Sequence, residues 1–191
     1  GLITGVADLD LKQGLRISAG EVTSTAGTVS INGASSLSNG TLSVFSGTFA
    51  LGGSFQKNGG QFSLSDSALR LLDNLTWTSD SLLELHELDL DNYSLTLGSD
   101  SSDLKVNNDL IMDHDNEKLI SGNADLEFSG MLSISEGEIS STGGSISMSK
   151  SLSLSGGTLS ISSGTFSLGG VFNKNGGNLF LNDMTLSLIS D

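Results

Sequence analysis

Residues 155–166 read SGGTLSISSGTF, and this stretch contains the pattern that decides the fold. Leu159 and Ile161 are separated by one serine, so an extended strand would point both side chains toward the same face. Gly-Gly and Ser-Gly pairs flank these residues, and glycine turns the chain readily because it accepts positive φ. The stretch therefore predicts a very short strand with one buried face, bounded by tight turns.

The same pattern runs through most of the chain. Apolar residues that alternate with polar ones begin a new run about every seven residues, at Leu15, Val22, Val29, Leu42, Phe49, Phe55, Phe62 and Leu69. Strands this short do not form an ordinary meander, whereas three of them with their turns fill about 20 residues, one coil of a parallel β-helix. We therefore predict an all-β parallel β-helix, or β-solenoid, with about 20 residues per coil and roughly nine to ten coils.

A long internal repeat supports this prediction. Residues 2–74 align without a gap with residues 119–191, and 38 of the 73 aligned positions are identical. The clearest match is LGGSFQKNGG at residues 51–60 with LGGVFNKNGG at residues 168–177. Aligned positions differ by 117 in residue number, which is close to six coils of roughly 20 residues each. We therefore expect each repeat to be six coils long.

The repeat also divides the chain. Residues 1–118 form the first long repeat, which consists of the aligned segment, residues 2–74, and an interval, residues 75–118, that has no second copy. Residues 119–191 form a second, truncated repeat, and we expect both to belong to one continuous solenoid. Since the second copy stops inside a unit, we also expect the repeat to continue in the parent protein.

Composition removes several classes of protein. Ser and Gly together make up 61 of 191 residues, which alone suggests low complexity, but 36% of residues are hydrophobic and can build a core. The chain has no Cys, which excludes disulfides and thiolate chemistry, and no Pro, which fits strands paired on both sides. It has no run of 18 apolar residues, so we expect no membrane insertion. A net charge of −14 makes nucleic acid a poor partner.

Units such as SGGTLSISSGTF at residues 155–166 resemble those of large bacterial surface proteins. The families concerned are the filamentous-haemagglutinin-type adhesins and the autotransporter passengers. The resemblance covers nearly the whole chain and rests on architecture and composition. It implies a right-handed β-helix and an extracellular, cell-surface location in a bacterium, and it assigns no functional residue.

The interval of residues 75–118 is chemically distinct. It holds 11 of the 22 acidic residues, both histidines, the single Trp and the single Tyr, but only two lysines. The simplest of three interpretations is a solvated face of further coils. In that case Leu88 and Leu90 point inward while Asp89 and Asp91 point outward.

The start of this interval leaves two local structures open. Ser81 and Glu84 have the spacing of a capping box, and Leu82, Leu85 and Leu88 could line a short helix. We nevertheless predict a strand, because the leucines at positions 83, 85, 88 and 90 continue the alternation with one slip.

The second interpretation of the interval is a Ca²⁺ site at Asp113, Asp115 and Glu117. These carboxylates alternate, so an extended strand would place all three on one face, and Ca²⁺ prefers clustered oxygen ligands. The chain lacks the Asp-x-Asp-x-Asp-Gly loop and the Gly-Gly-x-Gly-x-Asp repeat of known calcium sites. We expect no cofactor, with Ca²⁺ as the alternative, and we expect His86 and His114 to be surface residues.

The third interpretation is catalysis by paired carboxylates, as in carbohydrate-active β-helices. Such sites need two acids at a set separation and aromatic side chains on which sugars stack, and this chain has one Trp and one Tyr. Its two arginines, Arg16 and Arg70, are replaced in the second copy by Ser133 and Ser187. We expect that the chain is not an enzyme, although a polysaccharide lyase or glycoside hydrolase stays open as an alternative.

These observations together favour a structural or adhesive rod segment of a large extracellular protein. A stack of coils makes a stalk, fibre or matrix element whose length grows with the number of repeats. The open ends of a β-helix expose unpaired strands, so we expect flanking repeats or end-to-end self-association. Glycans or other cell-surface components are further candidate partners. A calcium-stiffened linker is a second alternative function.

Overall fold

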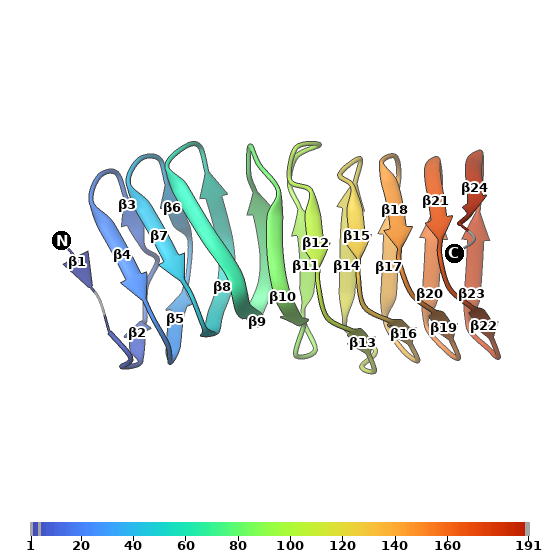
Figure 1. Cartoon of the computed structure of the whole chain (residues 1–191), viewed down its shortest axis with the longest axis horizontal. Helices are drawn as coiled ribbons and strands as arrows, with labels where there is room; N and C mark the ends of the chain where they lie inside the picture. Colours follow the sequence, from blue (N-terminus) through green and yellow to red (C-terminus); the bar gives the residue numbers. More distant parts are fainter. Residues whose placement is uncertain (1, 4, 190–191) are drawn as a thin grey trace.

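The computed structural model describes residues 2–3 and 5–189, which form a parallel β-solenoid of about nine turns (Figure 1). The turns stack along the long axis of the molecule, and the two termini lie at opposite ends. The strands lie on three faces, and most are short, although β8 (Gly47–Lys57), β9 (Gln61–Thr78) and β10 (Leu83–Asp89) are longer and continue from one face to the next. The described residues include no helix, and so none that could cross a membrane. The all-β solenoid, with successive strands roughly 20 residues apart, confirms the sequence prediction.

The first face is a parallel ladder that runs from one end of the rod to the other. Its members are β1 (Leu2–Ile3), β4 (Glu21–Ser24), β7 (Thr41–Val44), the start of β9 (Gln61–Thr78), the start of β10 (Leu83–Asp89), β12 (Leu104–Val106), β15 (Leu126–Phe128), β18 (Ser145–Met148), β21 (Gly164–Leu168) and β24 (Met184–Leu188). Strands β9 and β10 bend around corners, so β9 contributes to all three faces and β10 to the first and the second. The pairing of Leu64 with Leu85 carries the ladder across these two strands.

The third face is a second unbroken ladder. Its members are β3 (Arg16–Ile17), β6 (Ser35–Leu37), the end of β8 (Gly47–Lys57), the end of β9, β11 (Ser94–Leu97), β14 (Lys118–Gly122), β17 (Glu138–Ser141), β20 (Thr158–Ile161) and β23 (Asn178–Leu181). With the first face, it joins every turn to the next by backbone hydrogen bonds.

The second face is divided into two ladders. The amino-terminal ladder contains β2 (Leu9–Leu11), β5 (Thr28–Asn32), the start of β8, the middle of β9 and the end of β10. The carboxy-terminal ladder is a separate four-stranded sheet of β13 (Leu110–Met112), β16 (Leu132–Ile134), β19 (Leu152–Leu154) and β22 (Phe172–Lys174). In the described residues, β10 and β13 are not paired, so the second face is interrupted at mid-length.

One apolar core fills the solenoid. Along each strand, buried residues alternate with outward residues, as in β18, where Ile146 and Met148 are buried and the serines beside them face out. Equivalent positions on successive turns pair in register, so Val29, Phe49 and Leu69 form one column of the core. Each column buries its side chains against the turn on either side, and such burial is the main favourable term in folding.

Glycines shape several corners where two turns approach closely. Gly164 has φ 97°, and a Cβ atom there would collide with the carbonyl oxygen of Gly144 in the preceding turn. A side chain cannot occupy that space without moving the backbone. The glycine therefore allows the corner to turn and the two turns to stack.

The long repeat does not contain six turns, and this prediction was wrong. Leu9 lies on the second face in β2, whereas its counterpart Leu126 lies on the first face in β15. Ile17 of the third face likewise corresponds to Ile134 of the second face. The repeat thus advances the chain by five complete turns and two further faces. The arithmetic failed because it assumed turns of equal length, whereas the turns in the middle of the rod are longer than those near its ends.

The strand predicted over the leucines at positions 83–90 is confirmed as β10. Leu88 and Leu90 are buried, and the carboxylates of Asp89 and Asp91 are about half-exposed. The slip in the alternation corresponds to a register shift between Leu85 and Glu87, where the strand passes from the first face to the second. The helix alternative is therefore excluded for this segment.

Candidate functional site

Residues 75–118, which we name the acidic interval, form two turns in the middle of the rod. They run from the third-face end of β9, through β10 to β13, to the start of β14. The turns here are longer than elsewhere, as the pairing of Leu95 with Leu119 and of Leu104 with Leu126 shows. The added residues and the break between β10 and β13 make this the most irregular part of the surface.

The break opens a groove of about 270 Å³ between the end of β10 and β13. Its walls carry six carboxylates, one imidazole and the exposed side chain of Ile111; the carboxylates belong to Glu87, Asp89, Asp91, Asp109, Asp113 and Glu117. Arg70 lies beside this group: its Nη2 is 2.6 Å from Oδ2 of Asp91 and its Nε 3.6 Å from Oδ2 of Asp89. The hydrogen bond to Asp91 raises the pKa of Arg70 above its usual value. The groove is strongly acidic even with this arginine.

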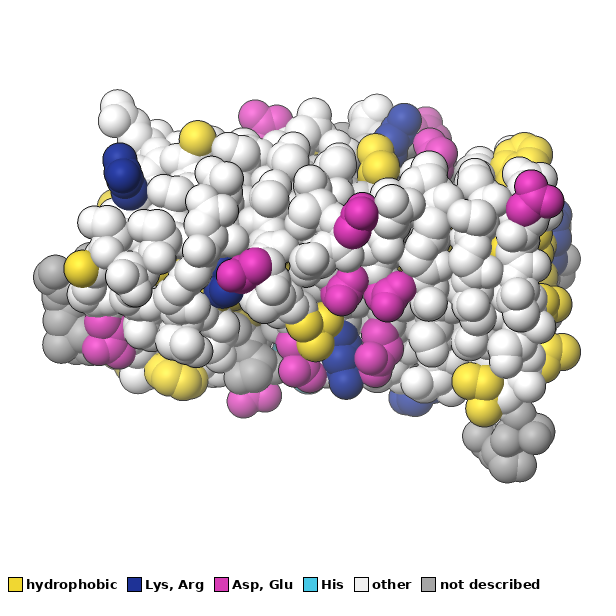
Figure 2. All heavy atoms as spheres, turned by 90° about the horizontal axis from the view of Figure 1, so that it is seen from above, with side chains coloured by type: hydrophobic (Ala, Val, Ile, Leu, Met, Phe, Trp, Pro, Cys, Tyr) yellow, Lys and Arg dark blue, Asp and Glu magenta, His cyan; other side chains and the backbone are white. Residues whose placement is uncertain are grey.

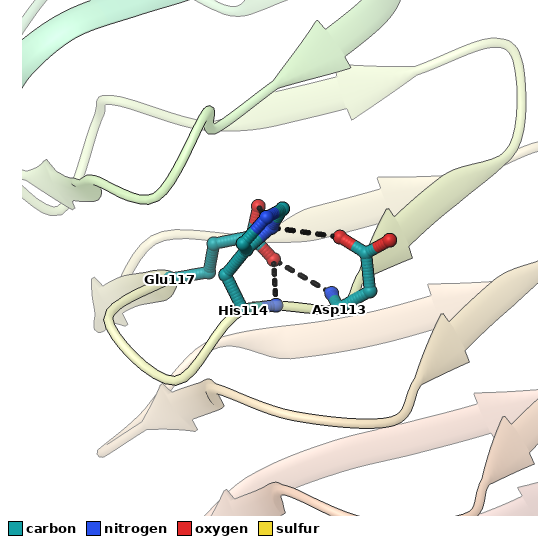
Figure 3. A group of neighbouring side chains, drawn as sticks. All are labelled: Asp113, His114 and Glu117. Carbon is teal, nitrogen blue, oxygen red and sulfur yellow. Dashed lines mark hydrogen bonds and ion pairs between the residues drawn. The ribbon is translucent and has the colours of Figure 1, made fainter.

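A tight turn at one side of the groove brings Asp113, His114 and Glu117 together (Figure 3). Glu117 has only 4% of its side chain exposed, and its Oε2 accepts hydrogen bonds from the backbone N–H of Asp113 (2.8 Å) and His114 (3.2 Å). The Nδ1 atom of His114 lies 2.9 Å from Oδ1 of Asp113 and 3.5 Å from Oε1 of Glu117. The buried carboxylate therefore closes the turn, and the imidazole bridges the two acids.

The structure differs from the backbone geometry that we assumed for the predicted calcium ligands. Residues 113–117 form a turn and not the extended strand that the prediction assumed, so Asp113, Asp115 and Glu117 do not share a face. Asp115 is exposed in the turn, and His114 takes its place, with one ligand atom from each of three residues within 4.8 Å of one another. Sequence reasoning assigned no contact to His114, although its spacing of three residues from Glu117 suits a contact across one tight turn.

The chemistry of this cluster fits Ca²⁺ only in part. Ca²⁺ takes six to eight oxygen ligands, whereas this turn offers two carboxylates and a nitrogen. One oxygen of Glu117 is already engaged by two backbone N–H groups. The three side chains satisfy one another, as expected of a structural turn, and calcium binding stays a prediction.

The first face of the acidic interval carries a second group of charges. The Nζ atom of Lys105 lies 3.1 Å from Oε1 of Glu127 and 3.9 Å from Oε1 of Glu84, so the lysine joins three successive turns. Its hydrogen bond to Glu127 raises the pKa of Lys105. Figure 2 shows acidic side chains gathered near the middle of the rod, whereas much of the remaining surface on this side is neither charged nor hydrophobic.

The aromatic residues of the interval are placed in or against the core. Trp77 is 1% exposed and stacks on Phe55, with ring centroids 4.3 Å apart and ring planes at 8°. Its indole N–H is buried and has no hydrogen-bond acceptor among the described residues. Tyr93 is partly buried against the core. Trp77 therefore cannot serve as a platform on which a sugar stacks.

The two histidines occupy the surface, as the sequence predicted. His86 lies on β10 and is exposed, and His114 has 57% of its side chain exposed.

Comparisons of the chain with known protein families, with curated protein sequences and with solved structures find no match.

Proposed function

We propose that this chain is a rigid, non-catalytic spacer: a rod segment of a repetitive extracellular protein that serves as a stalk, fibre or matrix element. The observation that carries this proposal is the pair of unbroken ladders on the first and third faces, which join every turn from β1 to β24. Because each strand hydrogen-bonds to the turn before and after it, bending the rod between any two turns would break the backbone hydrogen bonds and core contacts that join them.

The surface of the rod supports the same function. Outward positions of the strands are rich in Ser and Thr, as in β18 and β20, and the net charge is −14. Such a surface is soluble and resists non-specific association. The adhesin-like composition of the units supports an extracellular location and contact with glycans or other cell-surface components.

A calcium-stiffened linker is the second candidate. The observation that favours it is the cluster of Asp113, His114 and Glu117 beside the acidic groove. Carbohydrate turnover has less support, because Trp77 is in the core and Arg70 is paired with Asp91. Loss of any measured polysaccharide turnover on changing Asp113 to Asn would favour that alternative over the spacer.

The spacer function can be tested by measuring the distance between the two ends. The chain has no Cys, so spin labels at Gln13→Cys and Asn182→Cys report only on those two exposed sites. Eight turns at a strand spacing of about 4.8 Å predict a narrow distance distribution centred at about 40 Å. A flexible chain of this length predicts a broad distribution centred at about 70 Å, and that result would overturn the proposal.

A further inference from the structure

The carboxy-terminal end of the rod exposes a large apolar surface. Strands β22, β23 and β24 pair, within the described residues, only with the strands of the preceding turn. Their large hydrophobic side chains are therefore open on one side, including Phe172 (36% exposed), Leu186 (52%) and Leu188 (73%). Figure 2 shows hydrophobic side chains gathered at this end. We name residues 172–188 the terminal edge.

The first copy of the repeat shows what covers this surface elsewhere in the molecule. The counterparts of Phe172, Leu186 and Leu188 are Phe55, Leu69 and Leu71, which are 2%, 0% and 0% exposed. The covering turn lies at the beginning of the acidic interval, within residues 75–97, and consists of the end of β9 and of β10. The strand that follows, β11, pairs with the end of β9 and lies one turn further along the rod. Figure 1 shows the covering turn stacked directly on the first-copy equivalent of the terminal edge.

The contacts in the first copy are specific. Trp77 pairs in register with Phe55 and stacks on its ring. Leu88 pairs with Leu69, and Leu85 pairs with Leu64. The covering turn therefore supplies one apolar residue over each face of the edge: an aromatic ring over one face and a leucine over each of the other two.

A charge contact completes the first-copy interface. Lys57 has 9% of its side chain exposed, and its Nζ lies 2.5 Å from Oδ1 of Asp80 in the covering turn. The same Lys-Asn-Gly-Gly turn recurs at residues 174–177. There Lys174 is exposed and donates hydrogen bonds to the backbone carbonyls of Gly176 (2.9 Å) and Gly177 (3.0 Å). Lys57 is thus paired with a carboxylate of the covering turn, whereas Lys174, its counterpart on the terminal edge, contacts only backbone carbonyls among the described residues.

We propose that the terminal edge docks a β-solenoid turn of the same type as residues 75–97, with an aromatic ring over Phe172 and a carboxylate on Lys174. This deepens the proposed spacer function, on which it rests, by naming the kind of segment that covers the terminal edge. The partner is a strand-forming segment with alternating leucines and acids. It adds a strand to each face by β-augmentation.

A second copy of the chain is a poorer occupant. The amino-terminal turn corresponds to residues 119–134, which in this molecule are covered on that side by the last turn of the acidic interval. Both ends of the rod therefore correspond to surfaces that contact the acidic interval. Direct stacking of two copies would reproduce no interface present in the structure. A turn like residues 75–97 would instead meet Phe172, Leu181 and Leu186, the identical counterparts of the first-copy residues Phe55, Leu64 and Leu69 that pair with that turn.

The test adds a synthetic peptide of residues 74–97 to the intact chain and follows hydrogen exchange. The expected result is slower exchange in β22, β23 and β24, with no change in β2 and β3. Lys174→Glu should weaken peptide binding about tenfold, or about 1.4 kcal/mol, and a peptide carrying Asp80→Lys should restore it. Lys150→Glu, which makes the same charge change one turn away from the edge, should leave binding unchanged.

A tethered variant covers the case in which a free peptide is too disordered to dock. In it, a second copy of residues 72–118 follows Leu188, and the same exchange protection of the terminal edge is expected. The proposal is overturned if neither the peptide nor the tethered segment protects the edge. It is also overturned if the edge becomes protected on concentrating the chain alone, which would identify a second copy as the occupant. The distance between the spin labels does not depend on the peptide, so failure of docking and failure of the spacer function are separate results.

Discussion

Truncating the same leucine in the two copies of the repeat should have very different consequences. Leu69 lies between Phe49 and Leu88 in one column of the core and is 0% exposed. Its counterpart Leu186 pairs, among the residues that the structure describes, only with Phe166 of the preceding turn, and it is 52% exposed. The two positions share their side chain and local sequence pattern, so the comparison isolates burial.

The structure gives the size of the difference. Leu69→Ala removes a fully buried side chain and leaves an enclosed cavity, which costs about 2–5 kcal/mol. Leu186→Ala removes a side chain that is half in water already and leaves no enclosed cavity. Half of a transfer free energy of about 1.5–3 kcal/mol is about 1 kcal/mol. We therefore expect Leu69→Ala to cost about 2–3 kcal/mol more than Leu186→Ala, a difference of about 50-fold in the unfolding equilibrium.

Hydrogen exchange measured strand by strand is the appropriate assay. Solenoids can unfold in parts, so a single transition does not define their stability. Emission from Trp77, the only Trp, reports in addition on the turns around Leu69. Outward substitutions at equivalent positions, Ser30→Ala and Ser147→Ala, should both change stability by less than about 0.5 kcal/mol. Equal losses for the two leucine variants would refute the reasoning, since they would show that burial in the two copies does not differ as the structure describes.

Three further predictions concern single contacts. The hydrogen bond from Lys57 holds the pKa of Asp80 below its ordinary value, so its stabilisation is complete above about pH 4 and is lost as the pH falls through the lowered value. The melting temperature of Asp80→Asn should therefore lie below that of the parent at pH 7 and converge with it near pH 2; a gap that persists there contradicts the assignment. Gly164→Ala should lower the free energy of unfolding, measured in urea, by more than about 2 kcal/mol. Gly122→Ala, which has nothing within 4 Å of its added Cβ, should lower it by about 1 kcal/mol. Similar losses in the two variants would show that the close approach of the two turns at Gly164 is not the cause. The calcium hypothesis predicts a melting temperature that rises with Ca²⁺ and no longer does so in Glu117→Gln; an unchanged value in excess chelator removes it.

The fold could be predicted because its requirements are local. Each strand needs only two apolar residues separated by a polar one, and each corner needs small residues that accept unusual φ, so a window such as residues 155–166 shows both. The sequence also shows a slip in the alternation between Leu85 and Leu88, which is the point at which β10 passes from one face to the next. The number of turns in the repeat was not visible, because inserted residues between the strands of residues 75–118 lengthen turns without changing the alternation.

The backbone at the candidate site was predicted incorrectly, for a related reason. Alternating carboxylates share a face only if the backbone is extended, and that assumption failed at residues 113–117. There the carboxylate of Glu117 binds two backbone N–H groups and stabilises a turn, which brings in His114 and leaves Asp115 outside. The groove itself depends on the absence of backbone pairing between β10 and β13. Whether two separate strands pair is not visible in the local sequence pattern of either strand.

The displacement of the two copies by one face bears directly on function. Inward positions on all three faces require the same thing, an apolar side chain, so a repeat that ends one face early still builds a continuous core. Outward positions differ: Thr28, Ser30 and Thr48 lie on the second face, but their counterparts Ser145, Ser147 and Thr165 lie on the first. A ligand that needs one set of residues repeated along one flat face could not bind both copies on that face, because the set lies on a different face in the second copy. The proposed spacer needs only stacked turns and a polar surface, and the displacement preserves both. The register of the repeat therefore supports the proposed spacer over recognition by a single repeated face.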